Sequence, residues 1–431
     1  IVATIIIWYS FYLVLKRPTF IIPKYLGYLA AFPILITLSG FVTGVEQPLK
    51  WLFRLLFIWG GLAFFFSLFQ HGLKQGRLDR ILFIIVLSAL LQGLVGTAQV
   101  WLQSDMPFWL PKSPSGVPSG LFQQINSQAT YQVTVIMIAI YLATRPLLAK
   151  GAMWMQTTMI VTVASSAFLV SLSGSRIGLL GLLLGLTIVT PALWQRFKLN
   201  KKLSVLLLIA LIIGSTLGSL GLNTSKGAVV DKTVAMQSGY SGSARLGIYS
   251  ISLDLIKQQP LFGHGVGSFP RVWQYEKPTF FQTHPGAILP KSYVSHPHNE
   301  LIFLLVEGGF VAGIGLVIVL SGVLLALGRH SYKRGGAYFS ILLPVVLHTQ
   351  VELPLYVSVI HWILLLILLM VLVNHSLIVK KLEISNMALK LSRFTVVLVS
   401  TTVLIFLTHT MKSHDDFSEF YKPSNLNQQP F

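Results

Sequence analysis

The stretch Leu203–Leu222, LSVLLLIALIIGSTLGSLGL, contains no charged side chain. An α-helix rises 1.5 Å per residue, so a segment of this length covers the roughly 30 Å of hydrocarbon in a bilayer. The runs Trp51–Gln70, Arg80–Trp101 and Tyr356–Val373 have comparable length and character. Membrane barrels show shorter segments of alternating hydrophobicity instead. The sequence therefore predicts several membrane-spanning helices.

Composition places the whole chain in the same class. Of its 431 residues, 54% are hydrophobic and 10% are charged, against about 25% charged residues in an ordinary soluble domain. The chain has no cysteine, which excludes disulfides and Cys-ligated metals. Its net charge of +19 could suggest nucleic acid, but the basic residues are dispersed among short loops and form no basic domain. We expect no nucleic-acid partner.

The hydrophobic pattern predicts an all-α polytopic membrane protein. We expect one more span before Ile1, because the chain begins inside an apolar run. The long connection that follows residue 222 is far above the usual length of loops between helices, and such loops are commonly functional or disordered. The twelve predicted spans lie near residues 1–15, 25–44, 51–70, 80–103, 126–144, 153–172, 177–194, 203–222, 299–326, 337–352, 355–375 and 394–411.

The distribution of Lys and Arg predicts the orientation of these spans. The opposite short loops carry only Lys50, Lys112 and Arg176, so the basic loops are expected to face the cytoplasm. This divides the chain into a transmembrane bundle (1–222), a large external loop (223–298), further transmembrane helices (299–411) and an external tail (412–431). The basic loops carry Lys16, Arg17, Lys24; Lys74, Arg77, Arg80; Arg145, Lys150; Arg196, Lys198, Lys201, Lys202; Arg329, Lys333, Arg334; and Lys380, Lys381, Lys390, Arg393.

Two arginines on the external side are candidates for anion binding. Arg176, in SGSRIG, stands between two apolar spans with almost no loop around it. It could be an interface arginine that reaches the lipid headgroups, or a planar donor fork for phosphate. Arg245 precedes a predicted amphipathic helix at Leu246–Ile256. An arginine at such a position is usually just solvated, and anion binding is the alternative. His264 follows in PLFGHGVG, whose glycines could approach a ligand or simply make turns.

Three further polar motifs lie at predicted helix boundaries. His298, in SHPHNEL, is a candidate general base, because the pKa of imidazole lies near working pH; helix capping and zinc binding are the alternatives. Glu300 and Glu307 share a helix face. Gln124 and Asn126 open one span, and the motif HTQVELPLY holds Glu352 and Tyr356 at another junction. Polar residues at these positions are functional candidates or helix–helix hydrogen bonds.

The ordered combination of these motifs resembles the O-antigen ligase superfamily, and within it the pilin-type O-oligosaccharyltransferases. The resemblance extends from about Trp51 to Leu366. It implies a GT-C-like membrane fold in the bacterial inner membrane and a periplasmic active site. It also implies metal-independent transfer of a preassembled glycan, from undecaprenyl diphosphate to a Ser or Thr hydroxyl of a protein such as type IV pilin. No cofactor is expected.

Carried over by residue, the resemblance implies that Arg176 and Arg245 bind the donor diphosphate and that His298 activates the acceptor hydroxyl. Val357 and Val359 stand where pilin-type relatives often carry aromatics, so the acceptor groove is expected to differ. The alternatives are O-antigen ligation to the lipid A core, O-antigen polymerisation and, in another class, secondary transport. Against transport, the sequence shows no repeated halves. The residues implied to orient substrate are Gln124, Asn126, His264, Glu352 and Tyr356.

Overall fold

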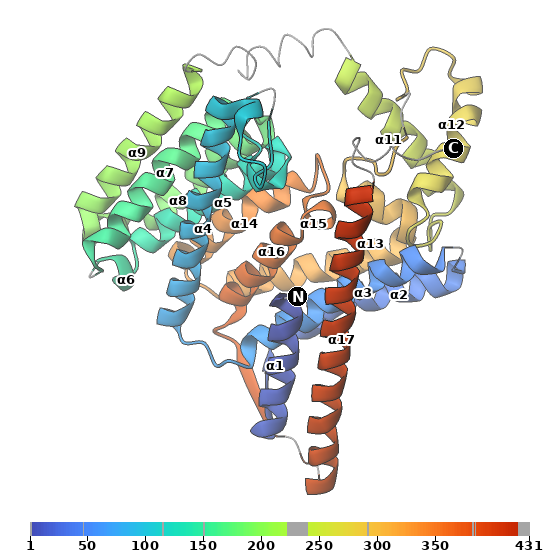
Figure 1. Ribbon diagram of the computed structural model, residues 1–431, viewed down its shortest axis with the longest axis horizontal. Helices are drawn as coiled ribbons and strands as arrows, with labels where there is room; N and C mark the ends of the chain where they lie inside the picture. The colour runs from blue at the N-terminus through green and yellow to red at the C-terminus, as the bar shows by residue number, and fades with distance from the viewer. Residues whose placement is uncertain are drawn as a thin grey trace.

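The computed structural model describes residues 2–45, 47–113, 116–149, 151–221, 240–290, 293–381, 383 and 385–420. Within them, a helix occupies each of the twelve predicted spans, so the all-α polytopic prediction is confirmed (Figure 1). These helices are α1 (Val2–Lys16), α2 (Leu26–Thr43), α3 (Pro48–Phe69), α4 (Gln75–Leu102), α5 (Ile125–Ala143), α7 (Met153–Ser173), α8 (Arg176–Phe197), α9 (Lys201–Ser219), α13 (Glu300–Gly328), α14 (Tyr332–His348), α16 (Val359–Val373) and α17 (Asn386–Phe420).

Apolar surface on these helices is suited to lipid. Seven helical segments among the described residues are long and apolar enough to cross a membrane by length and composition, and α8 and α9 together make one of them. The helices α1 and α16 are apolar but shorter. The remaining elements are η1 (Gln103–Asp105), η2 (Gly120–Phe122), α6 (Pro146–Ala149), η3 (Lys198–Asn200), α11 (Tyr240–Gln258), α12 (Phe269–Thr283), α15 (Pro354–Val357), β1 (Thr19–Pro23) and β2 (Leu377–Lys381).

The helices form two groups that meet along α14 and α16. In one group α4, α5, α7, α8, α9 and α14 pack together, and in the other α2, α3 and α13 pack together, with α1 against α3 and α17 against α1 (Figure 1). Contacts of α14 with α13 and α16 join the groups. At the centre of the first group, α5 is buried along almost its whole length. The polar side chains in its first turns are therefore enclosed by protein and not exposed to lipid, which explains why a membrane helix can carry them.

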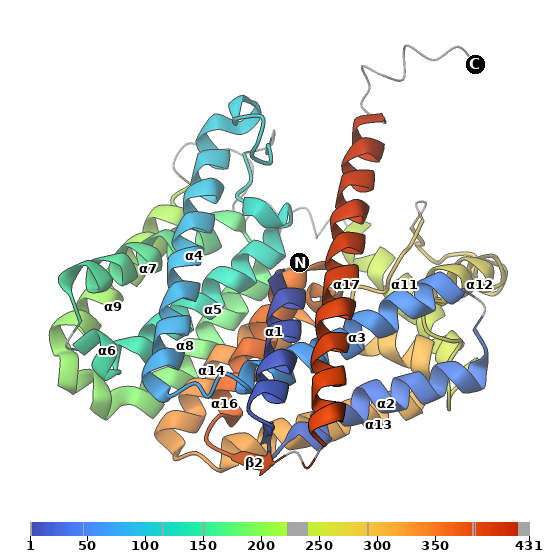
Figure 2. The same ribbon diagram turned by 60° about the horizontal axis from the view of Figure 1, so that its bottom comes forward.

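The basic loops gather at one end of the molecule. A small antiparallel sheet pairs Thr19 with Lys381 and Pro23 with Leu377, which joins the first basic loop to the last. The loop after α3 lies beside this sheet, because Asn374 Nδ2 donates to the Leu73 carbonyl (3.1 Å). This sheet lies at the foot of α17 in Figure 2. The sequence did not predict it.

The other basic loops are tied to the same end by polar contacts. Arg145 forms an ion pair with Asp79 (3.1 Å) near the start of α4. A ring nitrogen of His330 lies 2.9 Å from the Leu372 carbonyl. Lys333 Nζ donates to the Gln195 side chain at the end of α8. Because α5, α8 and α13 each have their other end at a predicted external motif, the candidate site and the basic loops lie at opposite ends of the bundle.

The motif Pro260–Gly267 packs into a break in α13. Gly309 has φ 60° and ψ −165°, which interrupts the helix. The freed backbone bonds to the motif: the N–H of His264 donates to the Val306 carbonyl (2.8 Å), and the N–H of Phe310 donates to the Pro260 carbonyl (2.8 Å). A Cβ on Gly263 would lie 2.6 Å from a backbone atom of Glu307. The glycines thus allow backbone to approach backbone at this joint.

Two segments extend beyond their predicted lengths. The external helix α11 includes the predicted Leu246–Ile256 but begins at Tyr240, so Arg245 lies inside it and not ahead of it. The last helix α17 continues to Phe420, so the predicted tail from residue 412 is helical at its start. Polar residues at both ends of α17 continue the helix beyond its apolar centre. Residues 223–239 of the predicted external loop and 421–431 of the predicted tail lie outside the described residues.

Candidate active site

A hydrogen-bonded chain of three side chains forms the centre of the candidate site. Arg245 Nη2 lies 3.1 Å from Glu352 Oε1, and the other carboxylate oxygen of Glu352 lies 2.9 Å from His298 Nδ1. Arg245 comes from α11, His298 from the residues just before α13, and Glu352 from the connection between α14 and α15. The Glu352 side chain is 14% exposed, whereas that of Arg245 is 41% exposed. The carboxylate is thus an inner support for two groups that reach the surface.

This arrangement fixes the chemical role open to each ring nitrogen of His298. With Nδ1–H donated to the carboxylate, Nε2 is the nitrogen that can accept a proton from a substrate. Burial by itself would raise the pKa of Glu352, but the hydrogen bond from His298 and the nearby charges of His298 and Arg245 lower it overall. A carboxylate that stays ionised can stabilise the imidazolium formed when His298 takes up a proton.

The backbone of His298 has a conformation that is rare for a side-chain-bearing residue. Its φ is +54°, a region that costs energy and persists where surrounding contacts enforce it. The Tyr249 hydroxyl donates to the His298 carbonyl (3.4 Å), and the His298 N–H donates to His296 Nδ1 (3.3 Å). Burial, followed by the charge of His298, lowers the pKa of His296, which favours the neutral ring that this hydrogen bond requires.

Three hydrogen bonds hold the His298 segment against the Glu352 segment. Asn299 Nδ2 donates to the Gln350 carbonyl (2.9 Å), and the Glu300 N–H donates to the Thr349 carbonyl (2.9 Å). Glu300 Oε1 in turn accepts a hydrogen bond from the Leu355 N–H (2.8 Å). Asn299 also caps α13. These bonds fix the register of the two segments and thereby the distance between His298 and Glu352.

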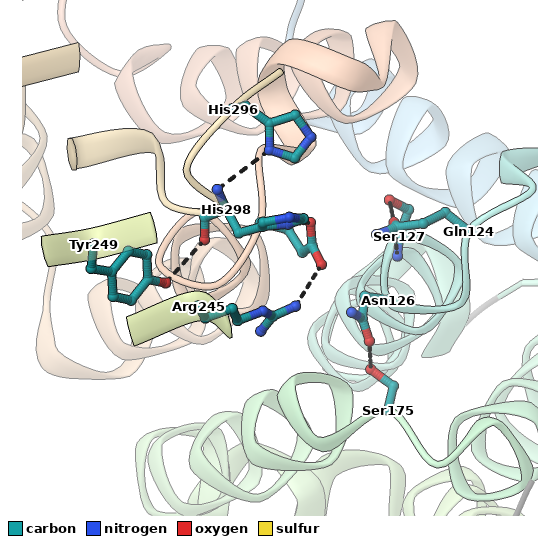
Figure 3. A network of polar contacts seen from close by, with 9 residues as sticks. Gln124, Asn126, Ser127, Ser175, Arg245, Tyr249, His296 and His298 are labelled. Carbon is teal, nitrogen blue, oxygen red and sulfur yellow. Dashed lines mark hydrogen bonds and ion pairs between the residues drawn. The ribbon is translucent and has the colours of Figure 1, made fainter. Parts of the chain in front are cut away.

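The N-termini of α5 and α8 lie together on the facing side of the site. Gln124 caps α5 by accepting from the Ser127 N–H, and Ser175 caps α8 by accepting from the Gly178 N–H. The Ser175 hydroxyl donates to Asn126 Oδ1 (2.8 Å), which joins the two ends. Helix N-termini attract anions, and the exposed Arg176 begins α8 at this point. Figure 3 shows the Arg245 side chain extending toward the side where Asn126 and Ser175 lie.

Two buried histidines connect the α5 side to the Glu352 segment. The Glu352 N–H donates to the His348 carbonyl (3.0 Å). The ring centroid of His348 lies 6.2 Å from that of His361, which in turn lies 6.1 Å from the ring of Tyr131 in α5. Both histidines are fully buried. Packed rings therefore continue from α5 to His348, whose backbone is bonded to that of Glu352.

A cavity of about 340 Å³ opens beside Arg245 and His298. One wall is α11 and the other is the segment that leads to His298. Cavities of 300 Å³ and more are large enough for small ligands. Its lining residues are Ala244, Arg245, Ile248, Pro290, Tyr293, Val294, Ser295, His296 and His298.

Two of the residues implied to orient substrate contact other parts of the structure. The His264 ring lies 2.8 Å from the Leu255 carbonyl, within the packing of the external loop. Tyr356 lies against the Arg54 guanidinium, 4.1 Å from its ring centroid, with Phe303 on the same cation at 4.5 Å. The structure thus places Arg245, His298 and Glu352 in one chain, with Gln124 and Asn126 on the facing side. His264 instead contacts the Leu255 carbonyl, and Tyr356 contacts Arg54.

Arg54 belongs to an ionic group that the sequence analysis missed. Its guanidinium lies 3.4 Å from Glu307, whose side chain is 2% exposed. Glu307 also accepts a hydrogen bond from the Phe269 N–H (3.3 Å), which links α3, α12 and α13. The sequence did contain a signal for this group: Arg54 lies inside an apolar span, and a cation at membrane depth requires a partner.

The fold and this arrangement define a polytopic α-helical membrane protein with a charged site at one end. The profile of the O-antigen ligase family matches residues 160–317, which include Arg176, Arg245 and His298. A second profile, of the C-terminal part of a virulence factor membrane-bound polymerase, matches residues 337–430, which include Glu352. The two matches together support the resemblance of this chain to the O-antigen ligase superfamily. No individual curated protein matches it significantly.

Similarity to this superfamily supports a membrane enzyme that transfers glycosyl groups as a ligase or polymerase, with a lipid-linked glycan as substrate. The first matched segment includes Arg245 and His298, and the second includes Glu352. Gln124 and Asn126 lie outside the matched segments, although they face the same site. Among the described residues no three or more His, Asp or Glu side chains gather as metal ligands.

Proposed function

We propose that this protein is an O-linked oligosaccharyltransferase. It transfers a preassembled glycan from undecaprenyl diphosphate to a Ser or Thr hydroxyl of a protein such as a type IV pilin. The observation that carries this proposal is the chain from Arg245 through Glu352 to His298, because it combines a base with a cation. A general base and an anion-binding group are what transfer from a diphosphate donor to a hydroxyl requires.

The proposed reaction is a single displacement at the anomeric carbon of the first sugar. The acceptor oxygen forms a bond to that carbon while the bond from the carbon to the diphosphate oxygen breaks. His298 Nε2 takes the proton of the acceptor hydroxyl, and the electron pair of the broken bond leaves with undecaprenyl diphosphate. Glu352 holds the ring through Nδ1 and stabilises its protonated form.

The donor diphosphate is proposed to bind between Arg245 and the α5 and α8 N-termini. Arg176 supplies a second guanidinium on that side, and each guanidinium can contact phosphate through two parallel N–H groups. These cations neutralise the charge that develops on the leaving group. The reaction is therefore proposed to proceed without a metal.

The two ends of the molecule support a proposal for its cellular placement. Basic loops favour the cytoplasmic side of a membrane, and these loops lie at the end opposite the candidate site. We place the protein in the bacterial inner membrane with its site facing the periplasm. Lipid-linked glycan would then enter the site from the outer leaflet.

Polymerisation of O-antigen repeats is the second candidate, and the description of the matched C-terminal profile favours it. Ligation to the lipid A core is a third candidate, in line with the description of the first profile. All three reactions share the donor and the proposed displacement. They differ in the molecule that carries the acceptor hydroxyl.

Reconstitution with separated acceptors tests this choice. Purified protein would be supplied with undecaprenyl-diphosphate-linked oligosaccharide and, in parallel reactions, with pilin, lipid A core or a second lipid-linked glycan. Mass spectrometry of each acceptor detects transfer. The proposal expects glycan on pilin; product on lipid A core alone, or only longer lipid-linked glycan, would contradict it and identify a ligase or a polymerase.

A further inference from the structure

The cavity beside His298 shares Arg245 with the proposed donor site but is not lined by the α5 and α8 N-termini on the other side of that site. Its walls come from α11 and from residues 290, 293–296 and 298, and they include neither the N-terminus of α5 nor that of α8. Figure 3 shows His298 and Arg245 between the α11 side, where Tyr249 lies, and the side of Asn126 and Ser175. In a displacement reaction the acceptor approaches the carbon opposite the leaving group. The cavity is therefore on the side from which an acceptor would approach.

The segment Tyr293–Pro297 forms one wall of this cavity and leads directly to His298. Tyr293 and Ser295 are exposed, whereas Val294 and Pro297 are buried. Alternation along Tyr293, Val294 and Ser295 is typical of an extended chain. Within the described part of the chain, no backbone hydrogen bond involves the N–H or carbonyl groups of Tyr293, Val294 or Ser295. Backbone groups left without a partner among the described residues are a template for pairing with another extended chain.

We propose that this segment binds an extended acceptor polypeptide by backbone pairing and that one residue of the acceptor enters the cavity. This inference deepens the proposed function and rests on it. Pairing along Tyr293–Ser295 would carry the acceptor chain toward His298, because the segment ends there. Backbone groups supply binding that is independent of acceptor sequence, and the cavity selects the side chain that enters.

A polypeptide fits these features better than a glycan does. Backbone N–H and carbonyl groups that have no partner among the described residues, at regular spacing, match another backbone, whereas a glycan presents hydroxyls at irregular spacing. The 340 Å³ volume is at the small end for ligand pockets, which suits one residue of an acceptor and not a branched oligosaccharide. Ile248 and Val294 add an apolar surface to the walls.

A scan with N-methylated acceptor peptides tests the pairing. Each peptide carries one acceptor serine and one N-methyl group, placed in turn at each neighbouring residue. In a paired strand only alternate N–H groups face the partner. N-methylation should therefore raise the KM for peptide roughly tenfold at every second position, the effect of losing one or two hydrogen bonds, and change it little between them. A profile without this alternation would overturn the pairing.

A matched pair of variants tests the enzyme side. Ser295→Pro removes a backbone N–H, and an extended segment can accommodate proline; Ser295→Ala keeps that N–H and removes only the hydroxyl. We expect Ser295→Pro to raise the KM for peptide roughly tenfold, with kcat at saturating peptide and hydrolysis of the donor by water both unchanged. Ser295→Ala should raise the KM for peptide less than Ser295→Pro does, because it keeps the backbone N–H.

The two proposals fail differently. Equal KM values for Ser295→Pro and Ser295→Ala would overturn the docking segment, and so would a loss of donor hydrolysis in Ser295→Pro. Wild-type transfer to saccharide acceptors alone would instead contradict the proposed function, and with it this inference. If peptide is glycosylated with a KM that changes neither with the N-methyl groups nor with Ser295→Pro, the proposed function still stands and only the backbone pairing is contradicted.

Discussion

At the scale of single residues, Glu352 explains how two distant charged groups act together. It contacts Arg245, 107 positions earlier in the chain, and His298, 54 positions earlier. One carboxylate thus fixes the ring nitrogen that His298 presents and the direction of the Arg245 guanidinium. Removing the Glu352 carboxylate would leave Arg245 and His298 in the protein but without the contact that orients them. A Glu352 variant therefore tests the orientation of these two groups, and variants of the two residues themselves test their chemistry.

Substitution of His298 tests the proposed base. We expect His298→Ala to bind lipid-linked donor nearly as well as the wild type and to lower turnover by roughly 10²- to 10⁴-fold, the usual size of general-base catalysis. Donor binding by titration and glycan transfer by mass spectrometry measure the two effects. Transfer at the wild-type rate would remove this assignment.

Substitution of Glu352 tests the support behind that base. Glu352→Gln keeps the shape but loses the charge that stabilises a protonated His298, so kcat should fall by up to about 10⁴-fold, as when the carboxylate of a Ser-His-Asp triad becomes an amide. Because the pKa of Glu352 is lowered by its partners, its ionisation stabilises the fold above the pKa of an unfolded glutamate. That contribution is lost as pH falls through the lowered folded value.

Thermal unfolding measured across acidic pH checks the second part of this prediction. The wild type should lose stability on acidification, and Glu352→Gln should lose less over the same range. Unchanged kcat together with identical pH profiles would show that Glu352 supports neither His298 nor the fold.

The geometry of the donor contact is tested by exchanging one cation for another. Arg176→Lys keeps the charge but loses the bidentate fork, so we expect a higher KM for lipid-linked donor and an unchanged KM for acceptor. Leu199→Ala, at an exposed position in the loop at the basic end, is a control for general destabilisation. Donor kinetics equal to the wild type would show that Arg176 contacts the lipid interface instead.

The sequence could predict these residues as candidates but not their grouping. Arg176 and His298 drew attention because each is polar at a span boundary, a signal that any membrane protein provides. The contact between Arg245 and Glu352 depends on how α11 lies over the α14–α15 connection, which no local pattern records. His264 was selected from a glycine-rich motif whose glycines, in the structure, serve backbone packing.

At the scale of elements, the broken helix α13 carries the external loop. Gly309 has a backbone conformation that essentially only glycine adopts, and a Cβ there would lie 2.4 Å from the Leu261 carbonyl oxygen. Gly309→Ala should lower stability by about 1–3 kcal/mol and loosen the loop that holds Arg245. Gly313→Ala is the matched control, since its Cβ meets only the flexible Leu305 side chain.

Thermal unfolding and limited proteolysis of both variants measure this effect. We expect a lower Tm and faster cleavage between α11 and α13 for Gly309→Ala alone. Equal Tm values for the two variants would show that the break is not a requirement of the fold.

Span positions were predictable because apolar length is a local property of the sequence. The ends of α17 were not, since polar residues can extend a helix beyond the membrane. The β1–β2 pair joins segments from opposite ends of the chain, and such pairing has no local signal. The break in α13 was equally hidden, because glycines are common in membrane helices without breaking them.

At the scale of the whole molecule, charge separates the two ends. Basic loops converge at one end and the proposed donor site lies at the other, where we propose that arginines take the role that a divalent cation fills in many phosphate-binding enzymes. We therefore expect glycan transfer to survive EDTA at full rate. Loss of activity in the chelator, with recovery on adding Mg²⁺ or Mn²⁺, would contradict the metal-independent mechanism.

The central claim is that one site holds the donor diphosphate between two arginines, with its anomeric carbon facing His298. A structure of His298→Ala bound to undecaprenyl-diphosphate-linked glycan measures this directly. The account predicts the diphosphate in contact with Arg176 and Arg245 beside the α5 and α8 N-termini, with the anomeric carbon turned toward position 298. A diphosphate bound more than about 15 Å from position 298, beyond the reach of any side chain, would contradict it.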